Sequence, residues 1–296
     1  MADQLPAGLG WTALLVARAR ATESRRSDRL FDDPLARDFV AAAGQALPDA
    51  EHAALPSLTH TDVDRWRTDY VAIRTRFCDD YLIEACVTGC RQVALLAAGL
   101  DTRAFRLPWP QGVRLFEVDL PDVFSFKERV LAERGLAPAC QRVVAPADLR
   151  EDWPAALRSA GFRVAEPTAW LVEGLLMYLM EKERDRLLDR VGELSSPGSR
   201  LALDHRPGFF ASPATSLPSG GDGESSSAAR FALLAQSAST DASLIEPAAW
   251  LDRHGWQAKT KQPEELFATY RRSLPAPLQP ASAGSAQSWL ATAERG

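Results

Sequence analysis

The chain contains 296 residues, more than the usual domain size of about 100 to 150 residues, but α/β folds often form one unit of about 250 residues or more. Hydrophobic residues make up 46% and charged residues 25%, which is typical of a soluble globular protein. The net charge of -5 argues against a nucleic acid partner, and no run approaches the roughly 18 apolar residues of a membrane span, so we expect a cytoplasmic protein without a membrane partner.

Neither the cysteines nor the histidines form a metal-binding pattern. The four cysteines are scattered, at Cys78, Cys86, Cys90 and Cys140. No pair has the CxxC spacing of zinc and redox sites, so we expect reduced packing residues. Three histidines also lack the spacing of metal ligands: His52, His60 and His254. The sequence therefore predicts no metal site.

Residues 11–85 show helical periodicity rather than strand alternation. One amphipathic helix is marked by aromatic and aliphatic residues at steps of four, three, four and four: Trp66, Tyr70, Ile73, Phe77 and Tyr81. Before it, Asp33 is a candidate N-cap, Pro34 occupies the first helical position, and Gly44 marks a predicted helix end. The first quarter of the chain is predicted to be mostly helical.

From residue 91 the pattern changes to short apolar runs, which are QVALLAAG, VRLFEVDLP, QRVVAPAD, AWLVEGLLMYL and SRLALDHR. Helical stretches separate these runs at 122–134, 152–160 and 181–194. This alternation predicts βαβ units in a mostly parallel sheet, and ligands bind such sheets at the carboxyl ends of the strands. The last part of the chain adds helices in PAAWLDRHG and from Glu264, and strands around GWQAK and SWLATAE.

Residues 206–228 are rich in Ser, Gly and Pro and poor in apolar groups, so they bury too little surface to offset the entropy of ordering. We expect a mobile insertion there. It is either a solvated connector or a gate for substrate, because it follows a strand whose carboxyl end faces the predicted site.

The strongest local feature is a strand that ends in the small residues Ala97, Ala98 and Gly99, which let a ligand approach the backbone closely. Asp119 ends the next strand, 20 residues after Gly99, which is where nucleoside-binding folds place an acid that accepts from the ribose hydroxyls. A dinucleotide fingerprint would need three glycines in GxGxxG, and only Gly99 is present. The pattern favours a nucleoside that carries an amino acid, such as S-adenosyl-L-methionine.

Six stretches together resemble the leucine carboxyl methyltransferase family, including its bacterial natural-product O-methyltransferase branch. In chain order they are LFDDPLARDFV, VAIRTRFCDDYL, LLAAGLDTRAFRL, LFEVDLPDVFSFK, the Asp148-Leu149 pair and WLVEGLLMYL. The resemblance implies an α/β class I methyltransferase fold, with a Rossmann-like sheet of seven strands, the last antiparallel. It also implies an N-terminal helical lid over residues 1–88, a methyltransferase domain over 89–296 that contains the insertion 206–228, and S-adenosyl-L-methionine as the cofactor.

The resemblance also implies a set of cofactor-binding residues: Arg74, Ala97, Gly99, Asp119, Asp148, Leu149 and Glu173. By resemblance, Arg74 binds the carboxylate of the methionine part with its paired donors, and Asp119 accepts from both ribose hydroxyls. The Asp148 carboxylate and the Leu149 N–H would read adenine, and Glu173 would face the methionine part.

The family usually has Gly at position 97, so the methyl group of Ala97 could crowd the cofactor or shift it. Each charged residue also has a simpler interpretation. Arg74 could be a surface residue of an amphipathic helix, Asp119 could cap the following helix, and Glu173 could cap or brace its own turn. Glu117, two residues before Asp119 on the same strand face, is a secondary candidate.

The resemblance favours O-methylation of a carboxylate on a small natural-product or polyketide-type acid. A carboxylate is already ionised at neutral pH, so this reaction needs alignment rather than a general base. Two alternatives stay open. One is O- or C-methylation of a phenol or enol with His205 as the base and Tyr178 as a pocket wall. The other is a catalytically silent S-adenosylmethionine-binding module. The sequence does not define the oligomeric state.

Overall fold

The computed structural model describes residues 9–46, 62–206, 247–274 and 288–296. Apart from Arg206, the insertion predicted at 206–228 lies outside the described residues, as do His52 and His60.

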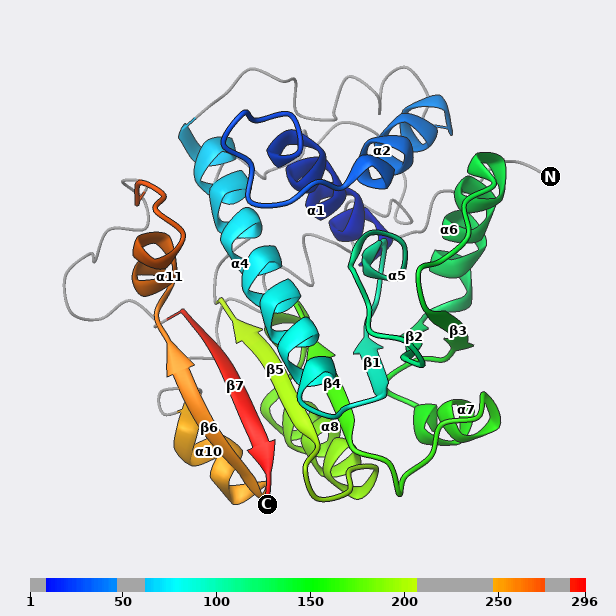
Figure 1. Cartoon of the computed structure of the whole chain (residues 1–296), viewed down its shortest axis with the longest axis vertical. Helices are drawn as coiled ribbons and strands as arrows, with labels where there is room; N and C mark the ends of the chain where they lie inside the picture. Colours follow the sequence, from blue (N-terminus) through cyan, green and yellow to red (C-terminus); the bar gives the residue numbers. More distant parts are fainter. Residues whose placement is uncertain (1–8, 47–61, 207–246, 275–287) are drawn as a thin grey trace, which may run out of the picture.

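The described residues of the N-terminal part form the helices α1 (Leu9–Glu23), α2 (Pro34–Ala46) and α4 (Asp62–Val87) (Figure 1). Asp33 caps α2 as predicted, because its Oδ1 accepts from the Ala36 N–H at 3.1 Å. The prediction that this helix ends at Gly44 was wrong, since α2 continues to Ala46. A glycine inside a helix costs only about 1 kcal/mol relative to alanine and need not end it.

The predicted alternation of strands and helices is confirmed. The seven strands are β1 (Gln92–Leu96), β2 (Arg114–Asp119), β3 (Gln141–Pro146), β4 (Thr168–Val172), β5 (Arg200–His205), β6 (Trp256–Lys261) and β7 (Trp289–Arg295). Their order in the sheet is β3-β2-β1-β4-β5-β7-β6. The last strand, β7, is antiparallel to both β5 and β6, and the five strands β1 to β5 pair in parallel.

The connecting helices are α5 (Arg103–Arg106), α6 (Pro121–Arg134), α7 (Trp153–Ser159), η1 (Leu176–Tyr178), α8 (Glu181–Glu193), α10 (Pro247–Arg253) and α11 (Pro263–Thr269). Local sequence sets their ends. Asp152 caps α7 by accepting from the Ala155 N–H at 3.3 Å. Gly135 ends α6 in the left-handed conformation, with φ of 60°.

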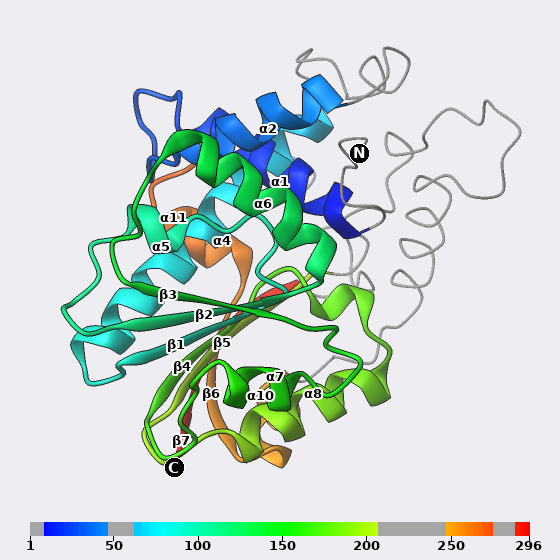
Figure 2. The same ribbon diagram turned by 90° about the vertical axis from the view of Figure 1, so that its right-hand side faces the viewer.

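The sheet lies between two layers of helices, which Figure 2 shows above and below it. Alternate residues of β1 point to opposite layers: Val93 and Leu95 join the core under α4, whereas Ala94 and Leu96 join the core under α7, α8 and α10. The central strands β1, β2, β4 and β5 are buried on both faces, which explains why their sequences are nearly continuous apolar runs.

Helix α4 belongs to the core of the sheet. The predicted periodicity is confirmed for the four members whose side chains are described, all buried: Tyr70, Ile73, Phe77 and Tyr81. Helices α1 and α2 pack on each other and on α6 through a separate apolar cluster that includes Phe39. The division into a lid and a domain at residue 88 stays a prediction.

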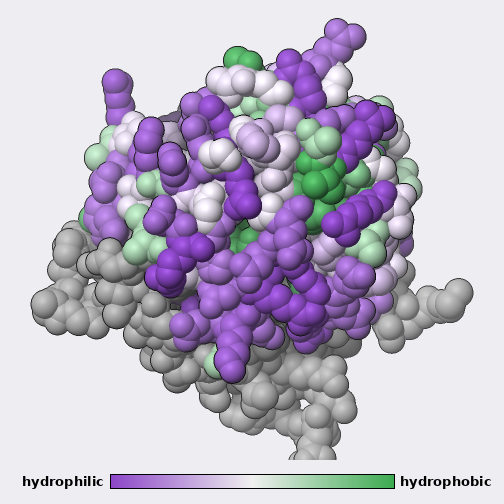
Figure 3. Space-filling view, turned by 90° about the horizontal axis from the view of Figure 1, so that it is seen from below, coloured by the Kyte–Doolittle hydropathy of each residue, from purple (hydrophilic) through white to green (hydrophobic). Residues whose placement is uncertain are grey.

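In Figure 1 the arrows of β1, β4 and β5 point upward, toward α1, and β2 and β3 run parallel to them, so the carboxyl ends of these five strands form the upper edge of the sheet. The opposite face is mostly hydrophilic, as Figure 3 shows. Within the described ranges, no helix has the length and apolarity to cross a membrane, and no cluster of three or more His, Cys, Asp or Glu could hold a metal. All four cysteines are free thiols, three of them buried.

Candidate functional site

A pocket opens at the carboxyl ends of β1, β2 and β4, beneath α1. Six of the residues singled out in the sequence line it: Arg74, Ala97, Gly99, Asp119, Glu173 and Tyr178. They come from α4, from the turns after β1 and β4, from the end of β2 and from η1. Asp148, Leu149 and His205 are not among its lining residues.

The turn after β1 forms the floor of the pocket. Gly99 has φ of 50°, and a side chain there would begin 3.2 Å from the Ala13 Cβ of α1. Ala97 also has a positive φ, of 57°, which costs a residue with a Cβ about 1 to 2 kcal/mol. The backbone conformation gives a physical reason for a glycine at position 97.

Asp119 links the ends of β1 and β2. Its Oδ2 accepts from the Gly99 N–H at 2.6 Å, and its Oδ1 accepts from the Leu120 N–H at 2.7 Å. Burial raises the pKa of Asp119, and these two backbone bonds oppose the rise. The N-cap position of α6 is occupied by Leu120, so the carboxylate braces the turn after β1 rather than acting as the N-cap.

Arg74 and Glu173 form an ion pair inside the pocket. Arg74 is 3% exposed, its Nε donates to Glu173 Oε1 at 2.9 Å, and its Nη1 donates to Asp204 Oδ2 at 3.4 Å. Asp204 is also buried and accepts from the Gly174 N–H at 2.6 Å. Arg74 is therefore a buried, paired cation of the pocket wall, and its interpretation as a surface residue is wrong.

Glu173 bridges two arginines. Its Oε2 lies 2.8 Å from Arg103 Nη1, in addition to the Arg74 contact. Burial raises the pKa of Glu173, but the charges of Arg103 and Arg74 outweigh burial and lower it to about 2. The side chain is ionised at every physiological pH.

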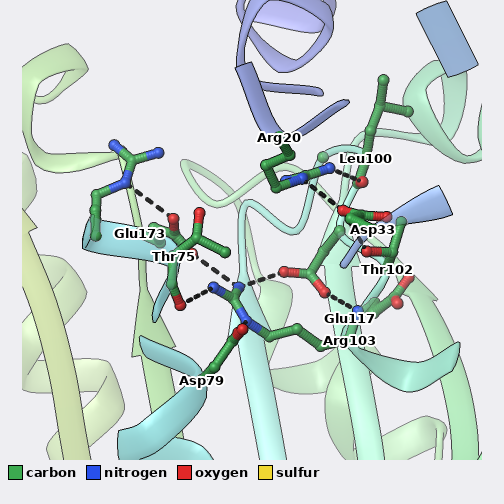
Figure 4. A network of polar contacts seen from close by, with 12 residues as sticks. Arg20, Asp33, Thr75, Asp79, Leu100, Thr102, Arg103, Glu117 and Glu173 are labelled. Carbon is green, nitrogen blue, oxygen red and sulfur yellow. Dashed lines mark hydrogen bonds and ion pairs between the residues drawn. The ribbon is translucent and has the colours of Figure 1, made fainter. Parts of the chain in front are cut away.

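Further buried charges surround the pocket (Figure 4). Arg20 of α1 pairs with Asp33 at 2.9 Å and donates to the Leu100 carbonyl at 2.5 Å, which fastens α1 to the turn after β1. Asp33 also accepts from Thr102 Oγ1 at 2.8 Å. These contacts connect the helix that covers the pocket to the pocket floor.

Three of the remaining candidates make other contacts. The Asp148 carboxylate accepts from Arg150 at 2.5 to 3.1 Å, and this bond lowers its pKa. Leu149 packs against the core beneath α7 and α8. Glu117 is fully buried and pairs with the side chains of Lys127 and Arg142. Glu117 therefore serves an internal ion network away from the pocket.

Tyr178, proposed as a pocket wall, and His205, proposed as a base, differ in position. Tyr178 lines the pocket, and burial raises the pKa of its phenol. His205 is 3% exposed at the end of β5 and packs against Trp289, with ring centroids 5.6 Å apart and the rings tilted by 38°. His205 is not one of the residues that line the pocket.

Sequence reasoning missed the buried charges that hold these groups: Arg20, Asp79, Asp101, Arg103 and Asp204. Three of them, Asp79, Asp101 and Arg103, stand in the stretches FCDDYL and LDTRAFRL, where charges interrupt apolar runs. Such charges require partners when buried, and that requirement was the available signal. Asp101 and Arg103 pair with each other at close spacing, but the other partners of Arg103, which are Asp79 and Glu173, lie far away in the sequence.

The pocket fits a nucleoside that carries a zwitterionic amino acid. It offers an aspartate at the end of β2, a turn of small residues after β1, and an arginine next to a glutamate. These features suit ribose hydroxyls, close backbone approach, a carboxylate and an ammonium group, respectively. Together with the seven-stranded sheet and its antiparallel β7, they define a class I S-adenosylmethionine-dependent methyltransferase.

The chain belongs to the leucine carboxyl methyltransferase family, whose model matches residues 13–192. It is 48% identical to a protein of Parafrankia sp. named as an S-adenosyl-L-methionine-dependent methyltransferase, over 91% of this chain and 84% of that protein. A relative of the same name in Streptomyces coelicolor is 43% identical over 91% of this chain and 90% of its own length.

The fold is similar to that of a protein from Thermobifida fusca whose crystal structure is titled as that of a methyltransferase. The TM-score is 0.51, and the sequences are 16% identical, with 99% of this chain and 96% of that chain covered. The protein is thus an S-adenosylmethionine-dependent methyltransferase, as the six sequence stretches predicted.

Proposed function

We propose that this methyltransferase transfers a methyl group to a carboxylate oxygen of a small organic acid of the natural-product type. When bound, the cofactor supplies an electrophilic methyl group on a positively charged sulfur. The acceptor then needs a lone pair on an ionised oxygen, and a carboxylate has one at neutral pH without help from a base.

The observation that carries this proposal is the pairing of Glu173 with both Arg74 and Arg103 at the methionine end of the pocket. The pKa of Glu173 is lowered to about 2, so this carboxylate is a poor proton acceptor. The raised pKa of Tyr178 keeps its phenol, which is hydrogen-bonded to Thr12, protonated and neutral, so this side chain is not a base either. A pocket with these two groups favours an acceptor that arrives already ionised.

The binding roles follow from position and chemistry. Asp119 keeps free lone pairs on both oxygens and would accept from the ribose hydroxyls. Arg74 lines the pocket and would bind the cofactor's carboxylate, while Glu173 would attract its ammonium group. Asp148 and Leu149 would read adenine. That role requires Asp148 to accept a further hydrogen bond beside Arg150.

The remaining contribution of the chain is exclusion of water and alignment. Val16 of α1 and Met177 of η1 give the pocket apolar walls. A dry pocket that aligns the acceptor oxygen with the methyl carbon can supply several kcal/mol of the barrier reduction, about 7 to 11 kcal/mol at most.

The test uses cofactor with an isotopically labelled methyl group and pairs of acceptors. Each pair contains a carboxylic acid and a phenol of similar size, with the blocked methyl ester of the acid as the matched control. We expect label on the acid alone, in a form that mild alkali releases as methanol, because esters hydrolyse and ethers do not.

Alkali-stable label on the phenol would contradict the proposal and favour a hydroxyl acceptor. Binding of the cofactor without turnover on any acceptor, including water, would favour the silent binding module instead.

A further inference from the structure

Arg103 is a buried arginine that three carboxylates surround. Its side chain is 2% exposed, its Nε lies 2.7 Å from Asp79 Oδ1, and its Nη1 lies 2.5 Å from Asp101 Oδ2 and 2.8 Å from Glu173 Oε2. The remaining nitrogen, Nη2, donates to the Thr75 carbonyl at 3.4 Å. One planar guanidinium therefore joins α4, the turn after β1 and the turn after β4 (Figure 4).

Glu173 is the only one of these carboxylates that also contacts Arg74 among the described residues. Its two oxygens are divided, with Oε1 on Arg74 Nε and Oε2 on Arg103 Nη1. If Glu173 paired with Arg74 alone, its carboxylate would move whenever the Arg74 side chain moved. With Arg103 on its second oxygen, Glu173 stays fixed to a rigid part of the fold.

This division matters when an anionic ligand approaches Arg74. An incoming carboxylate competes with Glu173 for the same guanidinium, and the competition is easier if Glu173 keeps a second cation. Glu173 without Arg103 would pair wholly with Arg74, block its donors, and turn away from the ligand's ammonium group.

We propose that Arg103 is a positioning residue that holds Glu173 in place, so that Arg74 is available to the carboxylate of the cofactor while Glu173 faces its ammonium group. The inference rests on the proposed function, which places the amino-acid part of the cofactor at these two residues. Arg103 itself acts through Glu173.

The neighbouring Arg106 provides a matched control. It lies on the same short helix, its side chain is 8% exposed, and it pairs with Asp79 at 2.6 Å. Within the described part of the chain, Arg106 forms ion pairs with Asp79 and Asp33, and neither pair involves Glu173. Loss of the Arg106 fork disturbs α5 but leaves the Asp79 carboxylate on Arg103 Nε and the Arg103–Glu173 contact in place.

The experiment measures the affinities of two probes by calorimetry on the full chain. S-adenosylhomocysteine carries the amino-acid part, and 5′-methylthioadenosine has the same nucleoside without it. Arg103→Lys keeps the charge but loses the fork that serves several carboxylates. We expect this variant to bind S-adenosylhomocysteine about tenfold or more weakly, which is the effect of losing one charged hydrogen bond. Its affinity for 5′-methylthioadenosine should be unchanged.

Arg106→Lys should leave the ratio of the two affinities at the wild-type value. In a Glu173→Gln background, Arg103→Lys should cause no further change in that ratio, because its effect passes through Glu173. If Arg103→Lys fails to fold, Asp79→Asn replaces it. This change removes the negative charge next to Arg103 Nε and so loosens the guanidinium that holds Glu173. We expect a smaller fall in the ratio of the two affinities.

An unchanged ratio in Arg103→Lys, or an equal loss of affinity for both probes, would overturn the inference. A wild-type protein that binds S-adenosylhomocysteine no better than 5′-methylthioadenosine would instead overturn the proposed placement of the amino-acid part. The two failures are therefore distinguishable.

Discussion

Ala97 occupies a left-handed backbone conformation, with φ of 57°, at the floor of the pocket. The surrounding fold fixes this turn, because the nearby Gly99 N–H donates to Asp119 and a Cβ at Gly99 would lie 3.2 Å from the Ala13 Cβ. Strain of this kind collects at ligand sites, where the chain needs an unusual path. Ala97 bears the strain without the glycine that would relieve it.

Ala97→Gly should stabilise the protein by up to about 1 kcal/mol, because relief of the left-handed strain exceeds the added entropy of the unfolded chain. Urea unfolding measures the change. Ala98→Gly is the matched control, since Ala98 has no positive φ and its replacement should destabilise by about 0.5 to 1 kcal/mol. Equal destabilisation by both glycines would show that position 97 is unstrained.

Glu173 should make stability depend on pH. Its pKa is lowered from 4.5 to about 2, so it contributes stability that is present above pH 4.5 and lost as the pH falls toward 2. The full contribution is on the order of 3 kcal/mol, and about 2 kcal/mol of it is lost by pH 3.

Unfolding free energies at pH 6 and pH 3 test this expectation. Glu173→Gln should lose less stability than the wild type between these pH values, whereas Glu181→Gln, at an exposed position, should keep the wild-type loss. Identical pH dependence in Glu173→Gln and the wild type would contradict the assigned ion pairs.

At the scale of elements, the turn after β4 places the pocket's charges. Gly174 has φ of 67°, and a Cβ there would lie 3.2 Å from Arg74 Nη1. Gly135, at the end of α6, has a similar φ of 60° but nothing within 4 Å of the same position. The two glycines share the backbone requirement and differ in what they contact.

Gly174→Ala and Gly135→Ala should therefore each destabilise the fold by about 1 kcal/mol. Only Gly174→Ala should weaken S-adenosylhomocysteine binding, by about tenfold, because Arg74 must move and its charged hydrogen bonds are disturbed. Calorimetry and urea unfolding on both variants separate the two effects. Unchanged binding in Gly174→Ala would mean that Arg74 does not hold the ligand.

Most elements were predictable because their patterns are local. The apolar run QVALL gives β1, Pro34 begins α2, and the 20-residue spacing from Gly99 to Asp119 marks a real contact, a 2.6 Å hydrogen bond. The ion network was not predictable, since Arg103 meets Asp79 and Glu173 only after the chain folds. Sequence spacing also could not reveal that Asp148 turns toward Arg150.

At the scale of the molecule, one end of the sheet carries the chemistry. The strands β1, β2 and β4 all end at the pocket, and Arg20 fastens α1 across it. No local sequence pattern shows which strands lie next to each other in the sheet. The family resemblance, however, correctly predicted that the last strand is antiparallel. The arrangement positions a cofactor between a fixed floor and a helical cover.

The most direct test of the account is calorimetric titration of the purified protein with S-adenosylhomocysteine, beside Asp119→Ala and the control Asp122→Ala, which alters an exposed acid three residues later. We predict saturable binding that Asp119→Ala weakens at least about a hundredfold and Asp122→Ala leaves unchanged, since Asp119 would lose two charged hydrogen bonds to ribose. Equal affinity of wild type and Asp119→Ala would contradict the assignment of the cofactor to this pocket.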